Sequence, residues 1–186
     1  MRGGNMSRIV TSVIMLITMG LCGCGVFRRD TDNIDGGVKT YNSGEDSPKV
    51  IESTEIIGFD FEVSLYSIVL EEESELVGRN YKLSAVLEDG AVKSKIKWRD
   101  RAGGGEEHDF SADASFMTSL QQIVSKYNFA KYNGCVSKVS GLPDMYGAKI
   151  DIAYASGENI YAHNNQDEFV PFEAVKELIE LFEMQI

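Results

Sequence analysis

Residues Tyr81–Trp98 read YKLSAVLEDGAVKSKIKW, and this stretch decides the fold class. Apolar side chains alternate with polar ones before the Asp89-Gly90 pair and again after it. Alternation with a period of two is typical of a strand with one buried face. An Asp-Gly pair between two such runs favours a tight hairpin turn, because both turn residues adopt positive φ. The stretch therefore predicts an antiparallel hairpin near Arg79–Arg99.

Three further stretches show the same period of two. Over Ile57–Leu65 every second residue is apolar, which predicts a strand before the hairpin. The apolar phase changes over Tyr66–Leu70, and we expect a bulge or a break there, because side chains on a strand cannot otherwise change face. Near the C-terminus, Ala148–Tyr154 and Asn159–His163 are predicted to form two strands joined by a turn.

Two helices are predicted from apolar residues spaced three and four positions apart. The first follows Arg101–Asp109, a glycine-rich stretch that we expect to be a flexible connection, and either Ser111 or Asp113 is suited to cap it. The second begins at Pro171, because proline is favoured at the first helical position. The inner stripes are Phe116, Leu120, Ile123, Val124 and Tyr127 in the first helix, and Val175, Leu178, Ile179 and Phe182 in the second.

These elements predict one α+β domain over residues 50–186. We expect a small two-layer domain, in which an antiparallel sheet of about five strands carries two helices on one face, in the order βββαββα. Residues 128–147 are expected to form a long irregular region within it. A domain of this length buries enough surface to be stabilised by an ordinary hydrophobic core.

The amino terminus carries a second kind of signal. The apolar run Ile9–Met19 follows Arg2 and Arg8, with no acidic residue before it, and leads into Leu21-Cys22-Gly23-Cys24. A positive start, about ten apolar residues and a small-residue cleavage site are typical of a secretory signal. A membrane-spanning helix, which needs about 20 apolar residues, and a buried core helix are the alternative interpretations.

Leu21-Cys22-Gly23-Cys24 resembles the lipobox of bacterial lipoprotein signal peptides. The resemblance implies a signal peptide over residues 1–23, cleavage before Cys24 and acylation of Cys24. The protein would then be lipid-anchored in the cell membrane, facing the extracellular side or the periplasm. Residues 24–49 are polar, rich in glycine and without periodicity, which predicts a flexible tether. Beyond the lipobox, the chain resembles only the broad class of small uncharacterised lipoproteins.

Charge and cysteine content restrict the partners and the source of stability. The formal net charge is −11 at pH 7, which argues against nucleic acid and against electrostatic docking on anionic lipid. If Cys22 leaves with the signal and Cys24 is acylated, Cys135 is the remaining thiol and no intrachain disulfide can form.

The sequence offers little catalytic chemistry. His108 stands among acidic residues after three glycines, and we expect it in a solvated loop rather than in a metal site. His163 is expected to be hydrogen-bonded at a strand end. Cys135 and His163 form the one thiol–imidazole combination that is available, although a small core residue is the more ordinary role for Cys135. The prediction is therefore no catalytic residue, no metal and no cofactor beyond the lipid on Cys24.

Tyrosines interleaved with amides and carboxylates indicate a binding surface. Tyrosine combines a rigid apolar face with a polar tip, and long loops on small scaffolds tend to carry function. The candidate surface comprises Tyr132, Asn133, Asp144, Tyr146, Tyr161 and His163. We expect a noncatalytic, membrane-anchored lipoprotein that binds another envelope component, a protein or a glycan. A small-ligand or glycan receptor is the first alternative, and an envelope hydrolase using Cys135 and His163 is the second.

Overall fold

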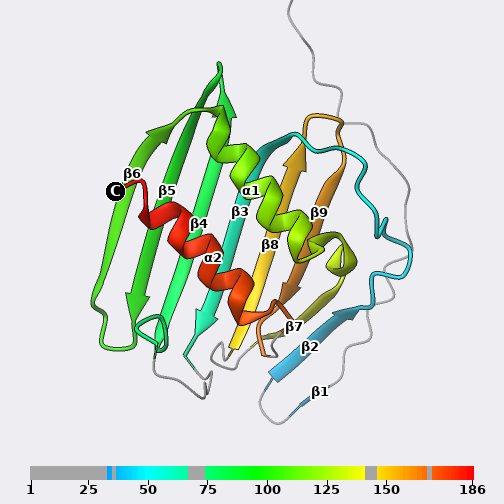
Figure 1. Cartoon of the computed structure of the whole chain (residues 1–186). Helices are drawn as coiled ribbons and strands as arrows, with labels where there is room; N and C mark the ends of the chain where they lie inside the picture. Colours follow the sequence, from blue (N-terminus) through cyan, green and yellow to red (C-terminus); the bar gives the residue numbers. More distant parts are fainter. Residues whose placement is uncertain (1–32, 35–36, 67–73, 141–145, 167–168) are drawn as a thin grey trace, which may run out of the picture.

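A computed structural model of the chain describes residues 33–34, 37–66, 74–140, 146–166 and 169–186. Over these residues, nine strands form one sheet in the order β1-β2-β7-β9-β8-β3-β4-β5-β6, and two α-helices lie across one of its faces (Figure 1). The strands are β1 (Asn33–Ile34), β2 (Gly37–Asn42), β3 (Ile56–Leu65), β4 (Arg79–Glu88), β5 (Ala91–Asp100), β6 (Gly105–Ala112), β7 (Val136–Ser140), β8 (Tyr146–Tyr154) and β9 (Asn159–Asn164). The helices are α1 (Ala114–Lys126), the short 3₁₀ helix η1 (Phe129–Tyr132) and α2 (Phe172–Glu183).

The hairpin that decides the fold is confirmed. β4 and β5 pair antiparallel from Arg79 opposite Asp100 to Glu88 opposite Ala91. Asp89 and Gly90 make the turn with φ of 52° and 81°, which are the two positive values that a tight hairpin requires. The predicted strands over Ile57–Leu65, Ala148–Tyr154 and Asn159–His163 are also present, within one residue at each end, apart from two further residues at the start of β8.

The core lies between the sheet and the two helices. All four residues of the predicted inner stripe of α2 are fully buried, and in α1 Phe116, Leu120 and Val124 are buried while Ile123 and Tyr127 are partly so. Phe182 of α2 packs edge-on against Phe116, with 5.0 Å between the ring centroids. Of the two predicted caps of α1, Asp113 is the one used, and its side chain accepts a hydrogen bond from Ser115 N at 2.8 Å. Pro171 is the N-cap residue, immediately before α2.

The α+β class and the two helices on one face are confirmed, but the number of strands is larger than the predicted five. The additional strands flank the predicted ones, with β1, β2 and β7 on one side of the sheet and β6 on the other. β6 occupies most of the stretch predicted to be a flexible connection, and β7 lies inside the region predicted to be irregular. Because β7 pairs parallel with β9, the sheet is mixed rather than purely antiparallel.

The predicted tether also differs from the structure. Gly37–Asn42, within residues 24–49, form β2 and pair antiparallel with β7. The lipobox and the apolar run before it lie outside the described residues, as does most of the phase change after Leu65. In the part of the chain that is described, no helix is both long and apolar enough to cross a membrane.

Candidate functional site

The face of the sheet that points away from α1 and α2 is the candidate site, and we call it the open face. Side chains that alternate with the core residues of each strand project from it. The register aligns six of them into a row that crosses the sheet from β9 to β6, which we call the charged row. The row consists of His163, Lys149, Glu62, Lys82, Lys97 and Glu107.

Ion pairs organise the β3–β6 half of the open face. Lys82 Nζ lies 2.9 Å from Glu62 Oε2, and Glu107 on β6 accepts hydrogen bonds from both Lys95 and Lys97 on β5. These two hydrogen bonds lower the pKa of Glu107 to about 2. The carboxylate therefore stays ionised over the physiological range and keeps the two lysines in place.

The open face has a different charge balance from the rest of the chain. The described strand residues on this face include seven cationic side chains, which are Lys82, Lys93, Lys95, Lys97, Arg99, Lys138 and Lys149. The same strand residues include six carboxylates, which are Asp60, Glu62, Glu88, Glu107, Asp109 and Asp151. Cations are thus in slight excess here, although the whole chain has a net charge of −11. Acidic groups consequently prevail on the remaining surface.

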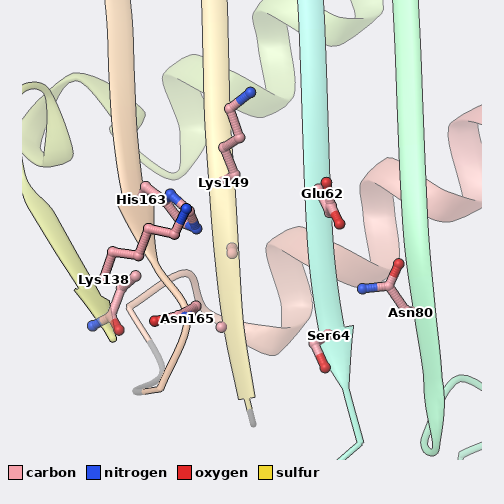
Figure 2. A pocket seen from close by; sticks show the side chains of 10 residues that line it. Glu62, Ser64, Asn80, Lys138, Lys149, His163 and Asn165 are labelled. Carbon is pink, nitrogen blue, oxygen red and sulfur yellow. The ribbon is translucent and has the colours of Figure 1, made fainter. Parts of the chain in front are cut away.

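The open face is hollowed between β9 and β4. A cavity of about 150 Å³, which we call the Ser64 hollow, is bordered by charged and polar side chains of five strands and by the residues that follow β9 (Figure 2). The side chains labelled in Figure 2 belong to Glu62, Ser64, Asn80, Lys138, Lys149, His163 and Asn165. A larger hollow of about 340 Å³ adjoins it, shares Glu62 and Lys149 with it, and extends to Lys95 and Lys97. The two hollows together form a polar depression across the middle of the sheet.

Gly147 on β8 forms part of the Ser64 hollow, where the chain passes close over it. A Cβ atom at this position would lie 2.4 Å from the carbonyl oxygen of Asn164 and 2.6 Å from Asn165 Cα. Both distances are far below van der Waals contact, so only glycine allows this approach. The absence of a side chain on Gly147 also helps to leave the hollow open.

Ser64 on β3 has an unusual environment for a hydroxyl group. It stands opposite Gly147 and Asn80, and only 4% of its surface is exposed. Its Oγ atom has no hydrogen-bond partner among the residues that the structure describes. Buried polar atoms are nearly always paired, so an unpaired hydroxyl beside a cavity requires an explanation.

Two of the predicted binding residues, Tyr132 and Asn133, make contacts within the fold. Tyr132 in η1 is partly buried, and its ring packs edge-on against Phe129 and Phe169, with centroids 6.3 and 5.2 Å apart. Asn133 is only 6% exposed. Its side chain accepts a hydrogen bond from Tyr161 N at 2.9 Å and donates to the carbonyl oxygens of Pro48 and Asn159. Asn133 therefore fastens β9 to the segment before β3.

The other predicted residues are divided between the open face and the undescribed part of the chain. Tyr161 and His163 project from the open face of β9, opposite Asp151 and Lys149. Asp144 lies outside the described residues, and of Tyr146 only the backbone is described, paired with Leu65 at the start of β8. Of the predicted residues, Tyr132 and His163 line one hollow, and Asn133 is bonded to the backbone of Tyr161.

A backbone hydrogen bond brings Cys135 and His163, the thiol and the imidazole singled out from the sequence, next to each other. His163 N donates to the carbonyl oxygen of Cys135 at 2.9 Å. The sulfur of Cys135 is directed elsewhere, because it donates to the carbonyl oxygen of Ser43 at 3.1 Å and lies 3.7 Å from Lys49 Nζ. Cys135, His163 and Tyr132 also line a separate hollow of about 200 Å³ at the β2 side of the sheet.

His108 is on β6 rather than in the predicted solvated loop, although it is exposed as expected. Its Nε2 atom lies 3.3 Å from Glu106 Oε2. Among the residues that the structure describes, no group of three or more histidine, cysteine, aspartate or glutamate side chains is placed to hold a metal ion.

Sequence reasoning did not single out Ser64, Lys138 or Lys149. The signal that was available is the polar half of each alternating strand, most clearly Lys93, Lys95 and Lys97 on β5, which indicates a solvated cationic face. Comparison of the chain with known protein families, with curated proteins and with solved structures finds no match in any of the three.

Proposed function

We propose that this chain is a membrane-anchored extracytoplasmic lipoprotein whose domain binds, without a catalytic step, an acidic protein of the cell envelope through the open face. The observation that supports the proposal is the excess of cations on the open face of an otherwise strongly acidic chain. An acidic partner would be repelled by the rest of the surface and attracted to this face. Such complementarity steers association and fixes orientation.

A protein partner fits the open face better than a glycan does. Sugar rings pack well on exposed aromatic side chains, since these offer a flat apolar surface with polar edges. Among the described strand residues of the open face, Tyr161 is the one tyrosine, phenylalanine or tryptophan. The lysines of the open face already pair with carboxylates of this chain, and they can pair in the same way with carboxylates of an acidic partner.

The proposal is tested by crosslinking in cells, with a photoreactive residue placed at position 82 or 97 on the open face. We expect both positions to capture the same acidic protein, identified by mass spectrometry. A photoreactive residue at position 176, on the exposed surface of α2, serves as the matched control and should not capture it. With the photoreactive residue at position 82, the variant Lys95→Glu/Lys97→Glu should abolish capture, whereas Lys176→Glu should leave it unchanged.

Two results would contradict the proposal. One is equal capture from the helical side, which would mean that the open face is not the binding surface. The other is capture that persists at full strength in Lys95→Glu/Lys97→Glu, because the cations then contribute nothing to recognition.

A small-ligand receptor is the second candidate function. The observation in its favour is the Ser64 hollow, with a buried hydroxyl that has no partner. This candidate does not depend on a protein partner.

A further inference from the structure

We infer that the Ser64 hollow is a binding site for a small amino or hydroxy carboxylate. The ligand's carboxylate would lie toward Lys138, Lys149 and His163, and its amine or hydroxyl group toward Glu62 and Ser64. The inference concerns a free small molecule and stands whether or not a protein binds the open face.

The two sides of the hollow differ in charge. Lys138 and His163 come from β7 and β9, whereas Glu62, Ser64 and Asn80 come from β3 and β4 (Figure 2). One side therefore offers a lysine ammonium group and an imidazole, and the other offers a carboxylate, a hydroxyl and an amide. A ligand with a negative and a donor end matches this polarity in one orientation only.

The size of the hollow matches such a ligand. β9 and β3 flank β8, so their backbones lie two strand spacings apart, about 10 Å. An amino acid with a hydrogen bond of about 3 Å at each end covers this distance. The volume of about 150 Å³ is comparable to cavities that admit a molecule of about six non-hydrogen atoms.

Two of the lysines at the hollow are not committed to ion pairs. Lys82, Lys95 and Lys97 on the same face each pair with a carboxylate. No carboxylate of the described residues lies within ion-pair distance of Lys138 or Lys149. Both amino groups therefore keep their full capacity to bind an anion.

Ser64 supplies the second, independent observation. Its hydroxyl is buried at the hollow without a hydrogen-bond partner, which is a costly state that a ligand's polar atom would relieve. A serine hydroxyl both donates and accepts, so it can bond either an amine or a hydroxyl group. Glu62, held by Lys82 at 2.9 Å, retains acceptor capacity for an ammonium group.

The test uses the full chain in detergent micelles, titrated with L-serine and followed by backbone amide shifts in NMR spectra. We expect saturable shifts at Gly147, Lys149 and His163. Ethanolamine, which lacks the carboxylate, should bind about tenfold more weakly or worse, since it loses the charge-assisted hydrogen bonds to the lysines. Acetate, which lacks the donor end, should also bind more weakly.

Variants separate the site from general effects. Lys138→Met/Lys149→Met should weaken L-serine binding at least about tenfold, since two charge-assisted contacts are removed. Ser64→Ala should weaken binding while leaving the melting temperature unchanged or higher, because it deletes an unpaired buried hydroxyl. Lys93→Met and Ser111→Ala, on the same face but away from the hollow, are matched controls and should bind L-serine like the parent chain.

The inference is overturned if L-serine gives no saturable shifts at the hollow, or if ethanolamine binds as well as L-serine. It is also overturned if the two control variants weaken binding as much as the hollow variants do. None of these results bears on capture of a protein partner, which depends on Lys95 and Lys97. Failure of the ligand site and failure of the proposed function are therefore distinguishable.

Discussion

Two asparagine side chains form hydrogen bonds of the kind that a neighbouring strand would form, and both lie where β7 and β9 meet. Asn165 accepts a hydrogen bond from Val139 N and donates one to Val139 O, both at 2.9 Å, as a neighbouring strand would. Asn133 bonds to Tyr161 N and Asn159 O in the same manner. The parallel ladder between β7 and β9 contains only two pairs of residues. The two asparagine side chains therefore supply hydrogen bonds that the short ladder lacks.

Asn133→Ala is expected to lower the free energy of unfolding by about 2 kcal/mol, because the partly buried hydrogen bonds to the Tyr161 amide and the Asn159 carbonyl are lost. Urea denaturation measures the change. Asn159→Ala, which removes an exposed side chain, is the control and should change stability by less than about 0.5 kcal/mol. If both variants were equally stable, Asn133 would not have the structural role assigned to it.

Asp60 and Asp151 face each other directly across β3 and β8. Partial burial, and then the charge of Asp151, raise the pKa of Asp60, while Lys149 offsets part of this effect. A carboxyl whose pKa is raised on folding destabilises the native state when it ionises. The cost is therefore absent at acidic pH and appears as the pH rises above the ordinary value of 3.8.

Asp60→Asn should consequently stabilise the protein at pH 7, by about 0.5 kcal/mol if the cross-strand repulsion is typical. The difference from the parent chain should vanish near pH 3, below the ordinary pKa of the Asp60 carboxyl, because that group is then uncharged in the parent chain as well. Urea denaturation at the two pH values checks this. Asp109→Asn is the matched control and should lower the free energy of unfolding at pH 7. Its carboxylate lies 3.3 Å from Lys95 Nζ, and the substitution removes this attraction. A destabilised Asp60→Asn variant at pH 7 would refute the assignment.

At the scale of elements, the β4–β5 hairpin depends on its turn. Gly90 has a φ of 81°, a conformation that costs a residue with a Cβ atom about 1 kcal/mol or more. Gly90→Ala should therefore lower the melting temperature by several degrees, as followed by circular dichroism. Gly58→Ala on β3 is a suitable control, because its added Cβ would make only an ordinary contact of 3.5 Å with Ala153 Cβ. Equal losses in both variants would mean that backbone conformation is not the cause.

The elements that the sequence predicts are those with one buried face. Alternation is visible in β3, β4, β5 and β8 because burial acts on one side of each strand. β6 has solvent on most of its surface and reads GEEHDFSA, so composition made it look like a loop. β2 and β7 are short strands and were missed for a similar reason, since strand pairing through the backbone leaves little trace in the side-chain pattern.

The candidate site was less accessible to prediction than the fold. Tyr132 and Asn133 combine an aromatic ring and an amide in a loop, which is a pattern that binding surfaces and packed loops share. The two cases can be told apart only from the structure, in which Phe169 contacts Tyr132 and the Tyr161 amide bonds to Asn133. Ser64 looks like any polar residue on a strand, and only the register with Gly147 reveals its hollow.

The whole molecule is two-sided. α1 and α2 cover one face of the sheet (Figure 1). The open face carries the charged row, the Ser64 hollow and the excess of cations. The start of β2 at Gly37 lies 13 residues after Cys24 and limits the span of the intervening chain to about 45 Å. If Cys24 is the anchor, the β2 edge of the sheet stays within this distance of the bilayer. The open face would then be presented beside the membrane rather than far from it.

Anchoring by Cys24 is the prediction that belongs to the full chain. Cys24→Ala removes the thiol that acylation requires, and several acyl chains together are needed for stable attachment. The variant should move from the membrane fraction to the soluble or secreted fraction, and its mobility on a denaturing gel should change because the lipid is lost. Cys135→Ala is the matched control, because it removes a cysteine without touching the lipobox, and it should stay in the membrane fraction. Membrane association and mobility that are unchanged in Cys24→Ala would rule out lipid anchoring. The distance limit set by Gly37 would then no longer apply. The charge distribution of the open face would be unaffected, because it depends on the folded residues alone, and it would still determine how a partner binds.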